Sequence, residues 1–351
     1  MTSIAKPPVR HPALQKNSAG LTQRDYEGAM STLCAGCGHD SVTAALVQAF
    51  FELEVEPHRV AKLSGIGCSS KTTAYFLKDA HGFNGVHGRM PAIATGVSAA
   101  NRTLTLVGVS GDGDSLSIGL GQLSHAIRRN VDMLYVLENN GVYGLTKGQF
   151  SASADLGSKA KRGEANRQKP IDPVLLALTL GASFVARSFS GDKEQLVPIL
   201  EAALRHRGFA FVDVISPCVT FNDHEGSTKS YASTRERYHD VAPVDFVPLR
   251  EEIQAEYVAG GAREVRMHDG SIVRFRKLDA DHDPTDRDAA YATVKRLQEG
   301  GEVVTGLLFM EEDAADMHAL NQTVHAPLYD YPYEQLCPGG AALDELMREL
   351  E

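Results

Sequence analysis

The stretch LTLVGVSGDGDS, from Leu104 to Ser115, decides the fold. Its first part, Leu104 to Ser110, has the pattern of a buried strand, and this strand ends in the acidic glycine turn Gly111 to Asp114. A helical pattern follows from Ser115 to Arg129, and a second apolar strand, DMLYVLEN, runs from Asp132 to Asn139. A strand, a helix and a strand in this order predict a parallel sheet with helices on its faces.

The same alternation continues on both sides of this unit. We expect an α/β core domain at residues 29–225, after an N-terminal arm at 1–28 and before a C-terminal extension at 226–351. The extension contains a predicted hairpin turning at Asp269-Gly270, a short helix and the apolar strand VVTGLLFM. Within the core we expect further helices at Asp40–Leu53, Ser70–Asp79, Val174–Leu180 and Lys193–Arg205, and a loop at His81–Arg89. We expect further strands at Ser183–Ala186 and Phe209–Ile215, and a short strand that runs into a glycine turn within Val60–Gly67.

Composition excludes several classes of protein. Of 351 residues, 43% are hydrophobic and 23% charged, which is typical of a globular protein. A net charge of −10 argues against a surface that binds nucleic acid or anionic lipid as a whole. The sequence has no apolar run long enough for a membrane span, and residues 1–20 have no apolar stretch of the secretory type, so we expect neither a membrane span nor secretion. Five cysteines are too few for a disulfide framework, so we expect a cytoplasmic protein.

Two polar turns follow the two central strands. Asp112 lies between Gly111 and Gly113 at the start of a helix, where free backbone N–H groups attract phosphate. An acid there makes sense if Mg²⁺ bridges it to a diphosphate, and Asn140, 28 residues later, can reach the same ion from the next strand end. The alternative is that both segments are ordinary surface turns.

Four cysteines lie in turns beside predicted strands or helices. Cys34 and Cys37 open the core domain, Cys68 lies in SGIGCSS, and Cys218 follows a strand in SPC. Four thiolates suit tetrahedral zinc or a 4Fe–4S cluster, and spacing alone does not decide between them. The CxxC pair alone would also suit a thioredoxin-like redox site. We expect Cys337, in QLCPGG, to be a free thiol.

These motifs carry a family resemblance. GDG followed by NN is similar to the thiamine diphosphate motif, which implies that Asp112, Asn140 and the carbonyl of Val142 hold Mg²⁺. CAGCGH, GIGCSS, SPC and GVYGLTKGQ resemble the β subunits of 2-oxoacid:ferredoxin oxidoreductases over about residues 31–225. The resemblance implies that Cys34, Cys37, Cys68 and Cys218 ligate a 4Fe–4S cluster.

The resemblance also implies a fold and a set of site residues. The fold is a parallel-sheet thiamine diphosphate-binding fold with helices on both faces and a C-terminal extension. His87 and Lys71 are the expected catalytic residues. The expected cofactor-binding residues are Gly67, Cys68, Ser69, His87, Gly111, Asp112, Gly113, Asp114, Asn140, Val142, Gly144, Leu145 and Thr146.

Several basic residues suit binding of the substrate. Lys71 could bind the far carboxylate of a dicarboxylic oxoacid, and His87 could hydrogen-bond the substrate, although Lys71 is equally readable as a solvated lysine. Arg89 could belong to the site or only fix backbone carbonyls of its loop, and His39 could cap the following helix or contact the cofactor. The loop Ser158 to Lys169, with five basic residues and one acid, could receive acidic ferredoxin or coenzyme A, but a solvated loop is the commoner outcome.

The resulting expectation is a β subunit that oxidatively decarboxylates 2-oxoglutarate to succinyl-coenzyme A and passes electrons through a 4Fe–4S cluster to ferredoxin. In proteins of the family that the chain resembles, the glutamate that activates thiamine comes from an α subunit, and no glutamate here lies in a motif suited to that role. The resemblance therefore implies an α subunit as partner, in an α2β2 heterotetramer. The alternatives are a pyruvate or branched-chain 2-oxoacid enzyme, a non-redox thiamine diphosphate decarboxylase with structural zinc, and a non-catalytic assembly subunit.

Overall fold

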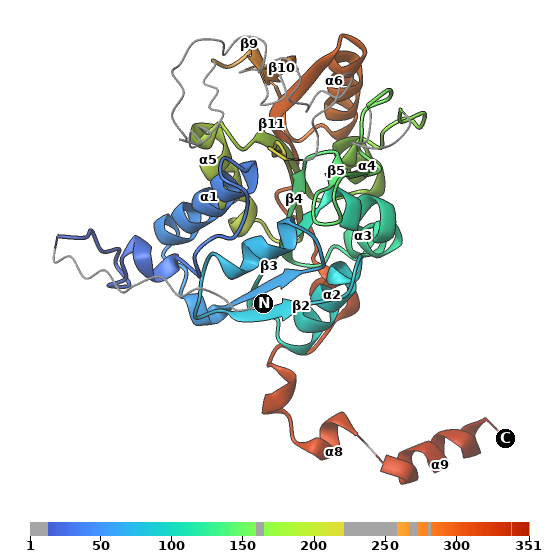
Figure 1. Cartoon of the computed structure of the whole chain (residues 1–351). Helices are drawn as coiled ribbons and strands as arrows, with labels where there is room; N and C mark the ends of the chain where they lie inside the picture. The colour runs from blue at the N-terminus through green and yellow to red at the C-terminus, as the bar shows by residue number, and fades with distance from the viewer. Residues whose placement is uncertain are drawn as a thin grey trace, which may run out of the picture.

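One large sheet forms the centre of the computed structural model (Figure 1). The structure describes residues 13–158, 165–220, 258–266, 272–279, 282–337 and 339–350. Within these ranges, nine strands pair in the order β2-β1-β3-β4-β8-β7-β11-β10-β9. Their bounds, in that order, are His81–Asn84, Val60–Ser64, Thr105–Gly111, Met133–Asn139, Phe209–Ile215, Phe184–Phe189, Glu302–Met310, Ile272–Lys277 and Ala262–Arg266.

The sheet is mostly parallel, as the sequence predicts. Strands β2, β1, β3, β4, β8 and β7 run in one direction. Strand β11 is antiparallel to β7, while β10 is parallel to β11 and antiparallel to β9. The carboxyl ends of β1, β3, β4 and β8, which are neighbours, therefore meet at one edge of the sheet.

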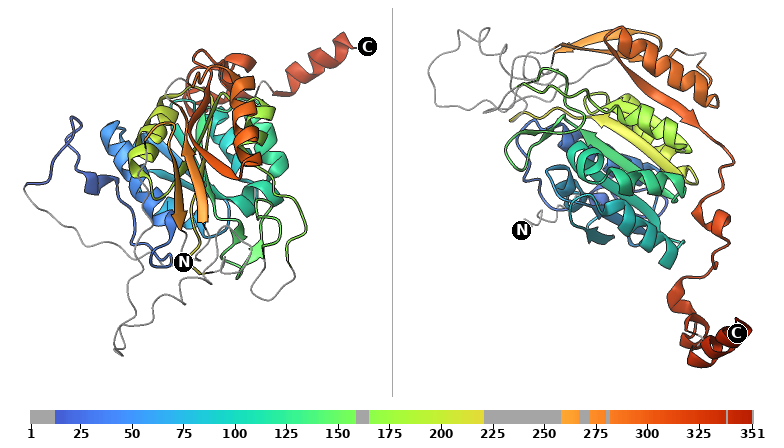
Figure 2. Two further views of the ribbon diagram at one scale, coloured as in Figure 1. Left: turned by 90° about the horizontal axis from the view of Figure 1, so that it is seen from above. Right: turned by 90° about the vertical axis from the view of Figure 1, so that its right-hand side faces the viewer.

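Helices cover both faces of the sheet (Figure 2). Helices α1 (Gly38–Glu52) and α5 (Lys193–Arg205) pack on one face. The other face carries α2 (Met90–Ala100), α3 (Leu120–Arg128), α4 (Pro173–Leu180) and α6 (Arg287–Glu299). Along β4, Tyr135 joins the layer of α3 and its neighbour Val136 joins the layer of α1, since successive side chains of a strand point to opposite faces. Burial on both sides explains why most residues of the central strands are apolar.

The C-terminal part of the chain enlarges this sheet. Strand β11 pairs with β7, and α6 adds Ala290 and Val294 to the central core. The expected hairpin is present as the antiparallel pair β9 and β10, although its turn at Asp269-Gly270 lies outside the described residues. Helices α7 (Met317–Asn321), α8 (Tyr333–Leu336) and α9 (Gly339–Glu349) follow, and α8 and α9 extend away from the body (Figure 1).

The end of the N-terminal segment packs against the body. Tyr26, the last residue of a short helix at Gln23–Tyr26, is fully buried. Its carbonyl accepts a hydrogen bond from the N–H of Leu77, and its ring meets that of Phe51 edge to face. Further single-turn helices lie at Pro57–Arg59 and Leu328–Asp330. None of the described helices is both long and apolar enough to cross a membrane.

Three local expectations were wrong. The helix expected at Ser70–Asp79 is a shorter 3-10 helix at Ser69–Ala74, and the long helix expected from Ser115 is a π turn at Gly113–Ile118 followed by α3. Strand β2 lies in a segment expected as a loop. All four β2 residues are exposed at the outer edge of the sheet, so this strand has no apolar pattern to reveal it.

Candidate cofactor site

The site lies where four neighbouring parallel strands end. Cys68 follows β1, Asp112 follows β3, Asn140 follows β4 and Cys218 follows β8. Ligands of open α/β sheets bind at this carboxyl edge because the loops there leave backbone groups and helix starts free. The topology therefore brings together residues that are far apart in the sequence.

One pocket at this edge is lined by every residue that the sequence analysis assigned to the cofactor. Its lining consists of Ile66, Gly67, Cys68, Ser69, His87, Gly111, Asp112, Gly113, Asp114, Asn140, Val142, Tyr143, Gly144, Leu145 and Thr146. Ile66 and Tyr143 were missed by the sequence analysis. Both adjoin motif residues, but nothing in their own chemistry marks them as ligands.

The carboxylate of Asp112 has two differently placed oxygens. Oδ2 accepts hydrogen bonds from the N–H of Gly141 at 2.9 Å and from the hydroxyls of Ser151 and Ser153. Among the residues that the structure describes, no donor contacts Oδ1. The side chain is 1% exposed, so burial of this carboxylate leaves one oxygen fully hydrogen-bonded and the other available to a cation. The donor set fits a magnesium diphosphate.

Gly113 is required by a close contact rather than by a ligand. A Cβ added at this position would lie 2.4 Å from the ring of Tyr143. The hydroxyl of Tyr143 donates a hydrogen bond to the carbonyl of Gly113 at 2.9 Å. The ring therefore closes over the start of the π turn, in which the N–H of Gly119 donates to the carbonyl of Asp114.

Asp114 holds the loop that carries His87. Its Oδ1 lies 3.0 Å from Nδ1 of His87 and 2.9 Å from the N–H of Gly88, and its Oδ2 accepts from the hydroxyl of Ser110. The carboxylate is an acceptor, so Nδ1 carries the hydrogen and Nε2 of His87 is left for a ligand. Asp114 therefore lines the pocket, but both of its carboxylate oxygens accept hydrogen bonds from other parts of the protein.

The segments that carry the four predicted cluster cysteines lie next to one another. The N–H of Gly38 reaches the carbonyl of Pro217, and the hydroxyl of Thr220 lies 3.1 Å from Sγ of Cys34, so the first and last cysteine segments are joined. A Cβ on Gly144 would lie 3.3 Å from Sγ of Cys68 and 3.9 Å from Sγ of Cys218. The absent side chain of Gly144 leaves room beside these thiols, which fits a cluster bound there.

Burial raises the pKa of two of the four thiols. Burial, together with the neighbouring Cys218, raises the pKa of Cys68 to about 11, and burial raises the pKa of Cys37 well above its usual value. Metal ligation requires thiolates, so iron binding would release a proton from each of these two thiols. Within the described part of the chain, no three His, Cys, Asp or Glu side chains are placed to hold one metal ion.

Two buried polar side chains, His39 and Glu138, lie near the cysteine segments and Asn140. His39 places Nδ1 2.6 Å from the hydroxyl of Ser216 and Nε2 3.4 Å from the amide nitrogen of Asn140. Burial lowers the pKa of His39 to about 4. Burial also raises the pKa of Glu138, whose carboxyl group accepts a hydrogen bond from the hydroxyl of Thr72. Sequence analysis missed Glu138, although an acid inside the apolar run MLYVLEN was a visible signal.

The remaining sequence candidates lie outside this pocket. Lys71 lines a larger neighbouring pocket of about 730 Å³, which shares Ile66, Gly67 and Leu145 with the cofactor pocket. Arg89 precedes α2 as its exposed N-cap. Residues 159–164 of the basic loop lie outside the described ranges. Cys337 is exposed, near α8.

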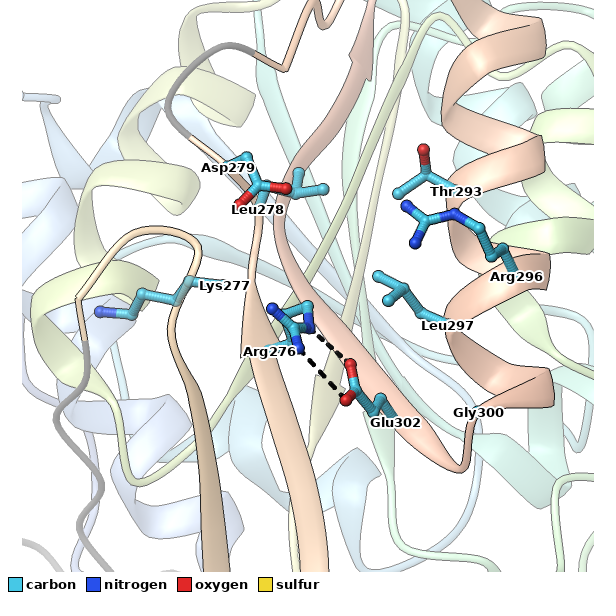
Figure 3. A pocket seen from close by; sticks show the side chains of 9 residues that line it. All are labelled: Arg276, Lys277, Leu278, Asp279, Thr293, Arg296, Leu297, Gly300 and Glu302. Atoms are coloured by element: carbon cyan, nitrogen blue, oxygen red, sulfur yellow. Dashed lines mark hydrogen bonds and ion pairs between the residues drawn. The ribbon is translucent and has the colours of Figure 1, made fainter.

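A further pocket lies between α6 and strands β10 and β11 (Figure 3). Arg276 faces Glu302 there, with Nε 2.5 Å from Oε2 and Nη2 3.3 Å from Oε1. This two-point pairing neutralises the arginine. The pocket contains none of the residues that the sequence analysis singled out.

Comparison with known proteins places these features in a family. Residues 65–214 match the family described as thiamine pyrophosphate enzyme, C-terminal TPP binding domain. The chain is 42% identical over 203 residues to the 2-oxoacid:ferredoxin oxidoreductase subunit beta of Saccharolobus solfataricus, covering 58% of this chain and 66% of that protein. For the subunit of the same name from Sulfolobus sp, the identity is 41% over 217 residues, with 62% and 70% covered.

Two further relatives carry the name of a particular oxoacid. The 2-oxoglutarate oxidoreductase subunit KorB of Mycobacterium tuberculosis is 43% identical over 192 residues, which cover 54% of this chain and 51% of that protein. The solved structure of 2-oxoglutarate:ferredoxin oxidoreductase from Magnetococcus marinus, with 2-oxoglutarate, coenzyme A and succinyl-CoA bound, matches with a TM-score of 0.70 and 30% identity over 89% of this chain and 91% of that chain. The match to the first curated relative thus spans just under two thirds of its length, 66%.

The fold and the pocket together define a thiamine diphosphate-binding protein. The relatives specify it further: the chain belongs to the β subunits of the 2-oxoacid:ferredoxin oxidoreductases. The family resemblance seen in the sequence motifs is therefore confirmed.

Proposed function

We propose that this β subunit serves an enzyme that converts 2-oxoglutarate, coenzyme A and oxidised ferredoxin into succinyl-coenzyme A, carbon dioxide and reduced ferredoxin. The observation that carries the proposal is the position of the cofactor pocket, which borders the four cysteine segments at one sheet edge and includes Cys68 in its lining. The KorB relatives and the 2-oxoglutarate-bound structural neighbour support the choice of oxoacid.

In this proposal, Asp112, Asn140 and the carbonyl of Val142 hold Mg²⁺ against the diphosphate of thiamine diphosphate. The available Oδ1 of Asp112 and the glycine-lined helix start support that assignment. When bound, thiamine diphosphate supplies a nucleophilic thiazolium carbon and takes up the electrons left by decarboxylation. The protein's own contribution is to orient the diphosphate and exclude water from the pocket.

Cys34, Cys37, Cys68 and Cys218 are the proposed ligands of a 4Fe–4S cluster. Such a cluster supplies a one-electron acceptor near the thiazolium, which zinc does not. Burial lowers the pKa of His39 to about 4, so this histidine adds no positive charge near the cysteines at neutral pH, and burial raises the pKa of the neighbouring Glu138.

Lys71 and His87 are the proposed substrate contacts. Nε2 of His87 is the ring nitrogen left for the 2-oxoacid, and Lys71 lines the adjoining pocket, where it can pair with the distal carboxylate of 2-oxoglutarate. Lys71→Ala should raise KM for 2-oxoglutarate about tenfold or more and leave KM for pyruvate unchanged, since pyruvate has no second carboxylate. Steady-state kinetics on both oxoacids, with Lys71→Arg as the charge-retaining control, checks this. Equal losses on the two substrates would contradict it.

An α subunit completes the proposed enzyme, in an α2β2 arrangement in the cytoplasm, with ferredoxin as the electron acceptor. The names of the relatives as β subunits support a partner. The isolated chain should therefore show no turnover. Full activity of the purified chain alone would refute the requirement for a partner.

Anaerobic purification of the chain with its partner tests the cofactors. We expect iron and sulfide in equal amounts, an absorbance band near about 400 nm that bleaches on reduction, and bound thiamine diphosphate that is lost when Mg²⁺ is chelated. A colourless protein that contains zinc would favour a non-redox decarboxylase instead. Binding of thiamine diphosphate without any need for a metal would overturn the magnesium site.

A further inference from the structure

A buried chain of polar contacts leads away from Asp112. The hydroxyl of Ser153 lies 2.5 Å from Oδ2 of Asp112 and 2.9 Å from Oδ1 of Asn139, so its single hydrogen is shared between these two acceptor oxygens. Ser151 contacts the same carboxylate oxygen, and its hydroxyl lies 3.1 Å from that of Ser153. All of these side chains are at most 7% exposed. The proposed metal ligand is therefore held by two serines from the loop after β6 (Gln149–Phe150).

The chain of polar contacts continues from Asn139 through a buried ion pair. Asn139 donates its amide to Oδ1 of Asp213 at 3.1 Å, and Nε of Arg187 donates to Oδ2 of Asp213 at 2.6 Å. Arg187 and Asp213 face each other in register on β7 and β8, and they are 3% and 0% exposed. Both oxygens of Asp213 are thus occupied, one by Asn139 and the other by the guanidinium.

The far end of this chain of polar contacts lies at α6, in the C-terminal part of the sequence. Nη2 of Arg187 donates to Oδ2 of Asp172 at 2.8 Å, and Asp172 also caps α4 by accepting from the N–H of Leu175. The side chain of Gln298, on α6, donates to the same Oδ2. Contacts therefore run without interruption from Asp112 through Ser153, Asn139, Asp213, Arg187 and Asp172 to Gln298.

A gain in the free energy of folding does not explain why buried polar side chains are used at these positions. A buried ion pair is often no more stabilising than apolar side chains of the same shape, because desolvating the charges offsets their attraction. A buried hydrogen-bonded network does, however, fix the orientation of its members. Outer contacts of this kind orient metal ligands and tune their affinity.

We propose that this chain positions Asp112 for metal binding: Ser153 and Asn139, held by the Asp213–Arg187 pair, direct Oδ1 of Asp112 toward the ion, and α6 secures the far end. This inference rests on the proposed function, since it assigns positioning residues to the proposed magnesium site. It gives the C-terminal segment a role in cofactor binding, although none of the residues that the structure describes in that segment lines the pocket.

Ser153→Ala tests the first link. In the full-length chain purified with its α subunit, equilibrium dialysis measures bound thiamine diphosphate at graded Mg²⁺ concentrations. The Mg²⁺ concentration for half-saturation should rise about tenfold, and Ser153→Thr, which keeps the hydroxyl, should recover most of the affinity. Ser98→Ala is the matched control, because Ser98 is also buried and bonded, to Nε2 of His318.

A second variant tests the middle of the chain. Replacing both members of the ion pair, Arg187→Met with Asp213→Leu, leaves no unpaired buried charge, so the protein should fold and yet need about tenfold more Mg²⁺.

Thermal melting of the metal-free protein separates an effect on positioning from an effect on folding. Ser153→Ala should have a melting temperature no lower than that of Ser98→Ala. An unchanged Mg²⁺ requirement in Ser153→Ala, or an equal rise in Ser98→Ala, overturns the inference while leaving the proposed function intact. If the unaltered protein binds thiamine diphosphate without Mg²⁺, both fail.

Discussion

Close contacts determine which residue type can occupy individual positions at the site. Gly113 lies against the ring of Tyr143, and Gly88, with φ +69°, lies against the backbone of Gly119, where an added Cβ would be 2.7 Å away. A side chain at Gly88 would therefore be strained both by its backbone angle and by its neighbour. These glycines let the loops after β3 and β2 approach each other, which brings His87 to Asp114.

Gly113→Ala should disturb the cofactor pocket directly. The new methyl group would displace the ring of Tyr143 and break its hydrogen bond to the carbonyl of residue 113. We expect at least about tenfold weaker binding of thiamine diphosphate and a loss of about 1–3 kcal/mol in the free energy of unfolding. Calorimetric titration and urea unfolding measure the two effects. Gly121→Ala, in α3 with nothing within 4 Å of the added Cβ, should bind normally.

His206 should make stability depend on pH. Burial against Phe184 lowers its pKa to about 4, and Nε2 lies 2.8 Å from the hydroxyl of Ser183. The unfolded chain, in which a histidine has its ordinary pKa of about 6.5, therefore takes up a proton first as the pH falls. The contribution is present in full above about pH 6.5 and is lost as the pH falls to about 4.

The measurement is urea unfolding at pH 7 and pH 4.5. We expect His206→Gln to remove about 2 kcal/mol from the difference in unfolding free energy between the two pH values. The matched variant His58→Gln alters a histidine whose side chain is 71% exposed, and its pH dependence should follow that of the unaltered chain. An unchanged slope in His206→Gln would contradict the assignment.

At the scale of elements, α6 joins the C-terminal segment to the core. Nη1 of Arg287 donates to the carbonyls of Leu178 and Ala182 at the end of α4, and its guanidinium carbon lies 3.9 Å from the centre of the Phe309 ring. One side chain thus contacts the end of α4 and strand β11 at once. The last carbonyls of a helix need such donors, because the helix supplies none.

Arg287→Ala should lower the free energy of unfolding by about 2 kcal/mol, through loss of two hydrogen bonds and the contact with Phe309. Arg287→Lys should recover only part of this, since an ammonium group lacks the planar guanidinium that stacks on the Phe309 ring while Nη1 reaches both carbonyls. Urea unfolding of both variants checks the order. Arg296→Ala, exposed on the same helix, is the control and should cost less than about 0.5 kcal/mol. A loss as large in Arg296→Ala would contradict the role of Arg287.

At the scale of the whole molecule, the C-terminal helices stand apart from the core. The large side chains of α8 and α9 are exposed, including Leu336 at 50%, Leu343 at 61% and Met347 at 53%. Residues with little buried apolar area add little to the stability of a fold. Removing residues 328–351 should therefore leave the free energy of unfolding of the chain within about 0.5 kcal/mol of its original value. Thermal and urea unfolding test this, and a large loss would mean that the tail packs on the body.

Much of the fold was readable from the sequence because its signals are local. The apolar runs at Thr105–Gly111 and Met133–Asn139 are strands buried on both faces, and α5 and β8 begin and end at the predicted residues. Polar turns directly after such strands then predicted a shared site, because the carboxyl ends of neighbouring parallel strands meet. The whole predicted cofactor set lines one pocket for this reason.

Other features were decided only by the tertiary structure. The sequence by itself determined the apolar strands, the helices between them and the ligand-bearing turns, since strand burial and turn chemistry depend on a few consecutive residues. The order of the strands, the exposed edge strand β2, the contacts of Ser153 with Asp112 and the pairing of Arg187 with Asp213 depend on segments that meet only in the folded chain. A serine or an arginine has the same local pattern wherever it lies, so only packing tells which of them face the site.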